Sequence, residues 1–383
     1  MMIHRSSDKQ CSHIGDSPLV TRDSLTSHES RATSDEQRTI SHVSLNRQTH
    51  IAPKIVFLDG LTGTGKTMMG PLLGSLRRVE LGRLEHHYEY LCALDFLKKI
   101  DPDAGEYMIK MYADLAMYNT MIARETNFRV NDLSGIFKNP KTLKYIRRLF
   151  IPDGEAVLER IRREQPILQI ISHQALGIMN LAFRAFGNRL RVVHMVRHPL
   201  YLLEHWHSYI DRHGTDARDF TIWINHQGTS LPWFAAGWEE RYAKASSMDK
   251  VIYSIEWLTR QTDKMTESLS PSQKQQILTI PFEHFVLNPN PFLESITKLL
   301  ETETTSQTKS ILKKQKCPRA LVGAGLSRDI YKRYGWKQPP LGATEKDQLS
   351  EKFDFANRLA SKEAMTALSV LCKNYEARYG LWF

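Results

Sequence analysis

Apolar residues gather into short runs that polar and turn-forming residues separate. The clearest runs are residues 55–58, 166–172, 190–196 and 277–280, and a fifth apolar run, V-I-Y-S-I, spans 251–255. Runs of this length, rich in β-branched and aromatic residues, are typical of strands buried on both faces of a parallel sheet. The pattern therefore predicts five buried strands.

Apolar residues at helical spacing fill much of the sequence between these runs. They predict helices over residues 68–78, 85–99, 101–125, 155–164, 176–186, 200–212, 237–246, 291–300 and 345–379. Strands that alternate with helices through short connections favour right-handed crossovers and a parallel sheet. The predicted fold class is α/β, with a central, mostly parallel sheet in a three-layer arrangement.

Residues 1–50 have a different composition from the rest of the chain. They are crowded with Ser, Thr, His, Arg and Asp, and their bulky apolar residues occur singly. Such a segment buries too little apolar surface to offset its ordering entropy. We expect a disordered N-terminal tail over 1–50 and one folded domain over 51–383.

A glycine-rich stretch, D-G-L-T-G-T-G-K-T, directly follows the first strand. Gly60, Gly65, Lys66 and Thr67 have the spacing G-x-x-x-x-G-K-[ST], with Gly63 between them. Glycines let successive amides face one concavity, and the following helix adds the positive end of its dipole. Lys66 offers a charge and Thr67 a hydroxyl for a phosphate or sulfate oxygen.

This stretch predicts a phosphate-binding loop and a P-loop NTPase-like fold. Its expected ligand-binding residues are Gly60, Gly63, Thr64, Gly65, Lys66 and Thr67.

The composition of the chain limits the classes of ligand and partner that we expect. The formal charge of +10 and the pI near 9.3 favour anionic ligands. No basic run is interleaved with aromatic residues, so we expect no nucleic acid, and no stretch is long and apolar enough for a membrane span. The four cysteines are far apart without a C-x-x-C pair, which predicts reduced thiols in a cytoplasmic protein and no metal site.

The predicted strand ends decide which chemistry the loop serves. A kinase or NTPase needs a carboxylate at a strand end to hold Mg²⁺, and only Asp59 or Glu256 is a candidate. The other strands end at His173 and Arg197. An imidazole and a guanidinium indicate a base and an anion contact instead.

Residues 167–208, with I-L-Q-I-I-S-H-Q and R-V-V-H-M-V-R-H-P, resemble the central part of sulfotransferases that use 3′-phosphoadenosine 5′-phosphosulfate. Residues 280–300, I-P-F-E-H-F-V-L-N-P-N-P-F, resemble a later segment of that family. The resemblance implies that His173 is the catalytic base and that Lys66 assists the transfer. It also implies that Arg197 and His205 bind the 3′-phosphate of the donor.

The family's basic C-terminal loop has several candidates in this sequence, namely Arg328, Lys332, Arg333 and Trp336. The resemblance implies an enzyme that moves a sulfuryl group to a hydroxyl or amine of a small molecule or glycan, without a metal. A P-loop kinase for a small molecule and a catalytically silent nucleotide-binding protein remain alternatives. The sequence leaves the acceptor and the oligomeric state open.

Overall fold

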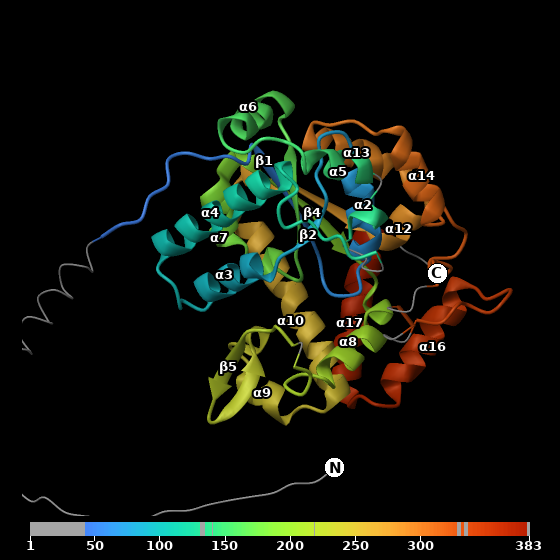
Figure 1. The fold of residues 1–383 in the computed structure, drawn as a ribbon. Coiled ribbons are helices and arrows are strands. Elements are labelled where there is room, and N and C mark those ends of the chain that lie inside the picture. The colour runs from blue at the N-terminus through green and yellow to red at the C-terminus, as the bar shows by residue number, and fades with distance from the viewer. Residues whose placement is uncertain are drawn as a thin grey trace, which may run out of the picture. The chain divides into compact units, whose positions relative to one another are not determined.

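The computed structural model describes residues 43–130, 135–139, 141–217, 219–327, 331–332 and 336–380. Within these residues, five parallel strands form a sheet in the order β2–β3–β1–β4–β7. The strands are β1 (Lys54–Asp59), β2 (Arg83–Leu84), β3 (Ile167–Ile171), β4 (Leu190–Val196) and β7 (Ile277–Pro281). The α/β class with a central parallel sheet is confirmed, and β1 lies at its centre (Figure 1).

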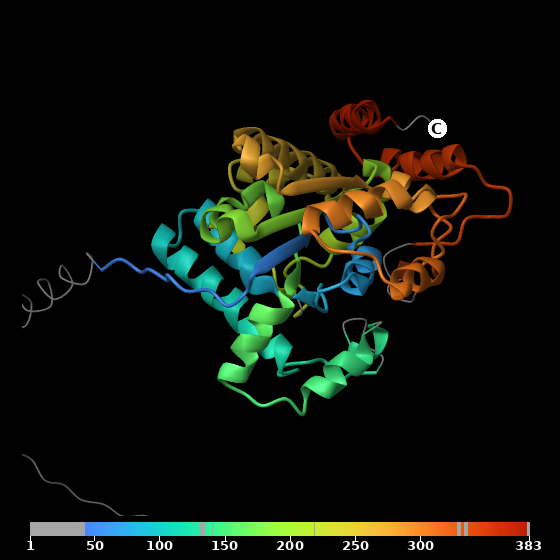
Figure 2. The same cartoon turned by 90° about the horizontal axis from the view of Figure 1, so that it is seen from above.

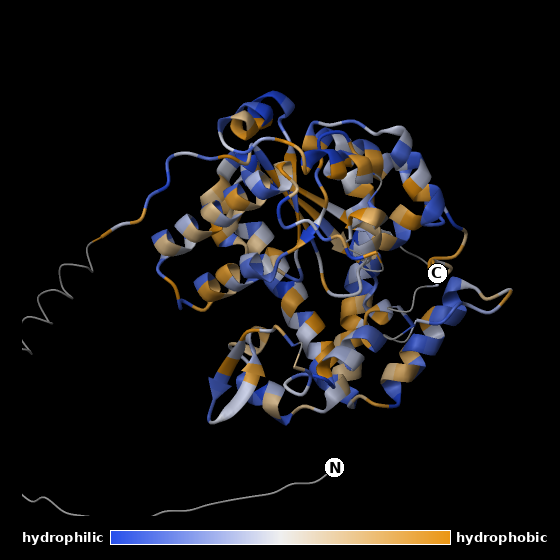
Figure 3. Ribbon diagram, in the orientation of Figure 1, coloured by the Kyte–Doolittle hydropathy of each residue, from blue (hydrophilic) through white to orange (hydrophobic). Residues whose placement is uncertain are grey.

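Side chains alternate across β1 and so build two separate cores. Ile55 and Phe57 belong to one hydrophobic core, whereas Val56 and Leu58 belong to the other. This is the two-residue period of a strand buried on both faces. The central strands of the sheet are strongly hydrophobic (Figure 3), and helices cover both sides of the sheet (Figure 2), as the three-layer prediction requires.

The helices divide between the two cores. The first core receives α3 (His86–Phe96), α4 (Pro102–Met121), α6 (Glu155–Glu164), α7 (Asn180–Phe186), α8 (Leu203–Ile210), α9 (Glu239–Lys244), α10 (Ser247–Ser268) and α17 (Lys362–Tyr379). The second core receives α2 (Lys66–Ser75), α12 (Phe282–Leu287), α13 (Asn290–Leu300) and α14 (Ser306–Lys314). α16 (Glu345–Asn357) contributes the buried Ala356 to the first core. The other helices are α5 (Thr142–Arg148) and α11 (Pro271–Lys274).

Two secondary-structure predictions are wrong. Residues 251–255 lie inside α10, not in a strand, and all five side chains are buried. A short apolar run cannot distinguish a buried strand from a buried helix, and here the Ser246 hydroxyl caps a long helix by accepting a hydrogen bond from the Asp249 amide. The predicted helix over 345–379 is two helices, because Ser361 caps α17 separately.

A β-hairpin falls in a region for which the sequence predicted no strand. β5 (Trp223–His226) and β6 (Thr229–Pro232) pair in antiparallel fashion. The two turn residues, Gln227 and Gly228, have φ of 50° and 82°. Two positive φ values are what a two-residue hairpin turn requires, and the Gly was the available signal.

The compact unit of the structure starts at Leu45, and the domain expected from the sequence starts at residue 51. The compact unit comprises Leu45–Phe383, and residues 1–42 of the expected tail lie outside the described residues. The Arg47 guanidinium is 2.7 Å from the Asp114 carboxylate of α4. Among the described residues, no helix combines the length and apolar character that crossing a membrane requires.

The parallel arrangement brings three strand ends to one edge of the sheet. Asp59 ends β1, His173 follows β3 and Arg197 follows β4. In parallel α/β sheets ligands bind at this edge, beyond the carboxyl ends of the strands. The sheet therefore gathers the predicted site residues although they are far apart in the sequence.

Candidate active site

The glycine loop (residues 60–67) connects β1 to α2 and packs tightly on neighbouring elements. Gly60 has a φ of 142°, and a Cβ there would lie 2.2 Å from the carbonyl oxygen of Met195. Gly65 has a φ of 97°, and a Cβ there would lie 2.4 Å from the ring of Phe282. Only glycine fits both places. The loop thus has the curled backbone, next to a helix N-terminus, that binds anions in other proteins.

The Lys66 side chain folds back over this loop. Its Nζ donates to the carbonyl oxygens of Gly60 at 2.5 Å and Leu61 at 2.9 Å. Burial lowers the pKa of Lys66 to about 8, although the carboxylates of Asp59 and Glu89 counteract the shift. The ammonium is therefore positioned inside the loop and still mostly charged at neutral pH.

The two threonines of the loop differ in accessibility. The Thr64 hydroxyl is buried and donates to the carbonyl oxygen of Leu61 at 2.8 Å. Thr67, in the first turn of α2, is exposed. Thr64 therefore supports the loop, and the hydroxyl that is accessible to a ligand belongs to Thr67.

Asp59 serves the fold. One carboxylate oxygen accepts from the Ser172 hydroxyl at 2.7 Å and the Ala175 amide at 2.9 Å, and the other accepts from the Leu176 amide at 3.0 Å. Burial alone would raise the pKa of Asp59, but the hydrogen bond and charge of His194 and the charge of Lys66 hold it well below its usual range. Both oxygens are thus engaged in joining β1 to the segment after β3.

Arg197 reaches the glycine loop from the end of β4. Its Nη1 donates to the Gly63 carbonyl oxygen at 2.9 Å. The guanidinium also lies over two aromatic rings, 4.7 Å from the centroid of Tyr201 and 4.5 Å from that of Phe282. Its Nε is buried and has no hydrogen-bond partner within the described part of the chain.

Arg319 is a second guanidinium at the same ring, and it was not among the residues predicted from the sequence. Its Cζ lies 5.5 Å from the Phe282 centroid, and its Nε is also buried without a partner among the described residues. Burial, followed by the charge of Arg197, lowers the pKa of Arg319 to about 10. Two partly buried cations beside one ring form a place where an anion is strongly stabilised.

The only sequence signal for Arg319 was the basic composition of the segment in which it lies. It lies in the basic, glycine-containing segment where the family's nucleotide loop was expected, but on the N-terminal side of the named candidates. Of those candidates, Arg328 and Arg333 lie outside the described residues. Lys332 is exposed, and the indole of Trp336 donates to the Gly323 carbonyl oxygen at 3.2 Å.

His205 projects from α8 toward the loop. A Cβ on Gly63 would lie 3.5 Å from its Nδ1. Burial, followed by the charges of Lys66 and Arg197, lowers the pKa of His205 to about 3. Its imidazole is therefore neutral at pH 7, so it can offer a hydrogen bond to a ligand but no charge.

His173 lies just after β3, next to the loop. The amide of the following residue, Gln174, donates to the Gly60 carbonyl oxygen at 3.1 Å. The His173 Nδ1 is 3.0 Å from a carboxylate oxygen of Glu89, a residue of α3 that was not among the predicted site residues. The predicted base and the predicted phosphate loop are thus neighbours in the fold.

A buried carboxylate, Glu283, binds the backbone directly after Arg197. Glu283 of α12 accepts hydrogen bonds from the His198 amide at 2.9 Å and from the Tyr375 hydroxyl at 2.7 Å. The His198 imidazole lies 3.1 Å from the Glu376 carboxylate. The C-terminal helix α17 therefore helps to fix the position of Arg197.

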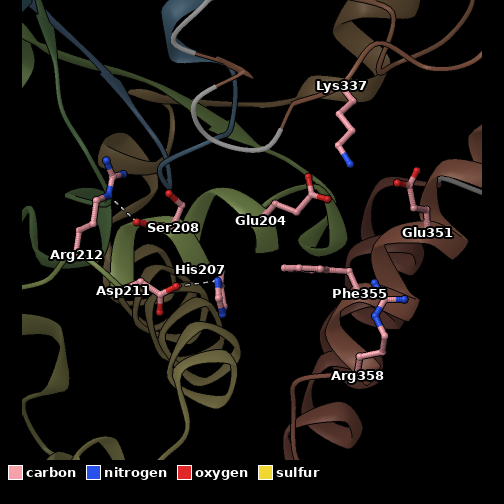
Figure 4. A pocket seen from close by; sticks show the side chains of 9 residues that line it. All are labelled: Glu204, His207, Ser208, Asp211, Arg212, Lys337, Glu351, Phe355 and Arg358. Carbon is pink, nitrogen blue, oxygen red and sulfur yellow. Dashed lines mark hydrogen bonds and ion pairs between the residues drawn. The ribbon is translucent and has the colours of Figure 1, made fainter.

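A separate pocket of about 420 Å³ lies between α8 and α16 (Figure 4). Its lining is mostly charged or polar and consists of Glu204, His207, Ser208, Asp211, Arg212, Lys337, Glu351, Phe355 and Arg358. The charges are mixed, and His207 and Asp211 already pair at 3.1 Å. None of the residues predicted from the sequence to form the site lines this pocket.

Comparison with known proteins adds distant likenesses. No family model matches the chain. Shikimate kinase of Chlorobium chlorochromatii (strain CaD3) is 25% identical over 96 residues, which are 25% of this chain and 49% of that protein. The chain thus matches about half the length of this curated relative.

Among solved structures, the sulfotransferase domain from the curacin biosynthetic pathway is 12% identical, covers 84% of this chain and 98% of its own, and has a TM-score of 0.40. The sulfotransferase domain of the Synechococcus PCC 7002 olefin synthase is 14% identical, with coverages of 89% and 100% and a TM-score of 0.38. Mouse sulfotransferase SULT7A1, complexed with PAP, is 12% identical, with coverages of 84% and 89% and a TM-score of 0.33. Likenesses with TM-scores this low carry no argument about function. A proposal for the function must therefore rest on the geometry of this chain.

Proposed function

We propose that this protein is a sulfotransferase-like enzyme that moves a sulfuryl group from 3′-phosphoadenosine 5′-phosphosulfate to a hydroxyl or amine acceptor. The observation that carries the proposal is the pair Arg197 and Arg319 on the Phe282 ring, next to the glycine loop. A phosphate loop alone would serve ATP equally well. A second cationic site beside it suits a nucleotide with an additional phosphate on the ribose.

The loop would hold the 5′-phosphosulfate of this donor. Its amides, the Lys66 ammonium and the exposed Thr67 hydroxyl are the available donors. Lys66 would exchange the carbonyl oxygens of Gly60 and Leu61 for donor oxygens. It would neutralise the charge that develops on the bridging oxygen as the bond from that oxygen to sulfur breaks.

His173 would act as the general base. Its Nδ1 is engaged with Glu89, which leaves Nε2 for the acceptor's proton. The acceptor oxygen or nitrogen forms the new bond to sulfur, its proton goes to Nε2, and the electron pair of the broken bond stays on the phosphate. The products are the sulfated acceptor and 3′,5′-adenosine bisphosphate (PAP).

The kinase alternative has less support from the described carboxylates. Asp59 has both oxygens in hydrogen bonds, and Glu256 lies on α10, 3.8 Å from Arg260. Neither is an open ligand at a strand end, which a Mg²⁺-dependent phosphoryl transfer usually needs. The proposal also includes a small-molecule or glycan acceptor and a cytoplasmic location.

Isothermal titration with PAP and 5′-AMP, with and without Mg²⁺, tests the proposal. Arg197→Ala and Arg319→Ala should each weaken PAP binding by about 2 kcal/mol or more, about 30-fold, because each removes a charge-assisted contact. Binding of 5′-AMP should barely change, and Mg²⁺ should have no effect.

A matched control is Arg162→Ala, which removes an exposed arginine of α6 paired with Glu155 and should leave both affinities unchanged. Equal weakening of PAP and 5′-AMP would contradict the assignment of the 3′-phosphate site. A preference for ATP–Mg²⁺ over PAP would support the kinase, and PAP binding without turnover of any acceptor would indicate a silent nucleotide-binding protein.

A further inference from the structure

One carboxylate lies between two imidazoles at the edge of the candidate site. Glu89 is in the first turn of α3, and its Oε1 accepts a hydrogen bond from the backbone amide of His173 at 2.6 Å. The same oxygen lies 3.0 Å from Nδ1 of the His173 ring. The other oxygen, Oε2, lies 3.9 Å from Nδ1 of His86.

We propose that Glu89 is the positioning residue of His173 and holds its neutral ring in the tautomer that carries the proton on Nδ1. The inference deepens the proposed function and rests on it. A neutral imidazole can accept a substrate proton at Nε2 only if its own proton is on Nδ1. By accepting from both the backbone amide and the ring of His173, one oxygen fixes the side chain relative to the main chain.

The surroundings keep Glu89 ionised and therefore able to accept both hydrogen bonds. Burial alone would raise the pKa of Glu89, but the charge of His173, its hydrogen bond to Glu89 and the nearby His86 lower that pKa. The residue also lies in the first turn of its helix, where the dipole favours a negative charge. A carboxylate at this place is thus an acceptor for ring N–H groups throughout the neutral pH range.

His86 is the second imidazole on this carboxylate, and it is the more exposed of the two. Its side chain is 36% exposed, compared with 28% for His173. The two rings are nearly parallel, 14° apart, with centroids separated by 6.0 Å. At 3.9 Å from Oε2, His86 contacts the carboxylate without competing for the oxygen that holds His173.

The same three side chains could in principle bind a metal ion, because they offer one ligand atom each within 4.8 Å of one another. The direct contacts favour hydrogen bonding instead. Oε1 already accepts from the His173 amide at 2.6 Å and faces its ring nitrogen at hydrogen-bonding distance. Metal binding is therefore an outcome that the experiment must be able to detect.

The test reads the tautomer of His173 directly, by ¹⁵N NMR of the full chain labelled on histidine, at a pH where the ring is neutral. His173→Asn identifies the signal by its loss. In the wild type we expect the proton on Nδ1. Glu89→Ala should shift the ring toward the Nε2–H form, whereas Glu89→Gln, which keeps an acceptor oxygen, should retain Nδ1–H.

Two controls separate positioning from a general structural role. His86→Asn removes the other imidazole and should leave the His173 tautomer unchanged. Glu106→Gln removes a carboxylate of α4 that pairs with Arg184, and it should also have no effect. A wild-type ring with its proton on Nε2, or an Nδ1–H ring that persists in folded Glu89→Ala, would overturn the inference.

A rate measurement that needs no known acceptor connects the tautomer of His173 to the proposed reaction. Hydrolysis of 3′-phosphoadenosine 5′-phosphosulfate, with water as acceptor, should slow by about tenfold or more in Glu89→Ala, while PAP affinity stays within about twofold. Failure of the wild type to bind PAP would refute the proposed function and leave the tautomer result readable by itself. Stoichiometric binding of Zn²⁺ that His86→Ala and Glu89→Ala abolish would overturn the inference in favour of a metal site.

Discussion

Lys66 occupies the glycine loop in an arrangement that makes anion binding sensitive to pH. The pKa of Lys66 is about 8, mainly because of burial, and a bound anion would favour the charged ammonium and raise that pKa. Binding above pH 8 would therefore require proton uptake. PAP affinity should fall as the pH rises from 7 to 9, and titration calorimetry at several pH values measures this.

Substitutions of Lys66 separate its charge from its shape. Lys66→Arg keeps a permanent charge and should remove the pH dependence between 7 and 9. Lys66→Met should bind PAP at least about tenfold more weakly at pH 7, because a charge-assisted contact is lost, and should also show little pH dependence. A wild-type affinity that is equal at pH 7 and pH 9 would contradict this role for Lys66.

His205 should make the folded protein sensitive to acid. The folded state holds the pKa of His205 near 3 through burial and the neighbouring cations, whereas an unfolded histidine binds its proton near pH 6.5. Between these values the unfolded state binds more protons, so stability falls as the pH decreases.

The variant His205→Asn isolates this contribution. When the pH falls from 7 to 5, the free energy of unfolding should decrease less in this variant than in the wild type. The difference between the two decreases should be about 1–2 kcal/mol. Denaturant unfolding at both pH values provides the measurement. A difference between wild type and variant that stays constant with pH would show that His205 is accessible to protons in the folded state.

At the scale of elements, α5 is attached to the sheet by a buried charge. Glu80, at the end of the turn before β2, accepts from both terminal nitrogens of Arg148 at 2.7 and 2.9 Å, and both side chains are fully buried. Burial alone would raise the pKa of Glu80, but the charges of Arg148 and Lys144 lower it to about 2. The Glu80–Arg148 pair thus anchors α5 to the turn that precedes β2.

Removal of one partner should be costly. Arg148→Met leaves the Glu80 carboxylate buried with less compensation and should destabilise the fold by about 3–5 kcal/mol. The double variant Glu80→Gln with Arg148→Met should cost less than Arg148→Met alone, because the uncompensated charge is gone. Thermal and urea unfolding measure both values, and a double variant that loses as much stability as Arg148→Met, or more, would refute a direct dependence of one charge on the other.

At the scale of the whole molecule, the N-terminal boundary of the folded unit can be tested by truncation. The compact unit begins at Leu45, whose amide donates to Asp103, and Arg47 contacts the buried Asp114. Deletion of residues 1–44 should leave the melting temperature unchanged. Deletion of residues 1–50 should lower it by a few degrees, because a charge-assisted contact is lost.

Scanning calorimetry of the two truncated proteins checks this prediction. Equal melting temperatures would restore the boundary at residue 51 that the sequence suggested. A large loss on removing 1–44 would show that the tail packs on the domain. Either result would move the boundary from the place that the contacts of Arg47 indicate.

The sequence by itself determined four of the five strands of the central sheet and its glycine loop; the two-residue edge strand β2 was not predicted. Strands β1, β3, β4 and β7 were predicted because each is a continuous apolar run that lies on a sheet with two covered faces. The loop was predicted because its glycines and Lys66 have local spacing requirements, and the structure gives Gly60 and Gly65 the positive φ values that such a loop needs. These features depend on neighbours in the chain, so the sequence alone reveals them.

Tertiary structure decided the partners of those residues. Arg319 meets Arg197 on the Phe282 ring, and Glu89 meets His173, although each pair is separated by many residues and no local pattern relates its members. Residues 251–255 were predicted as a strand and became a buried helix, because local hydrophobicity is the same for both and only packing distinguishes them. Contacts between distant segments are set by how the layers pack, and that information is not local in the sequence.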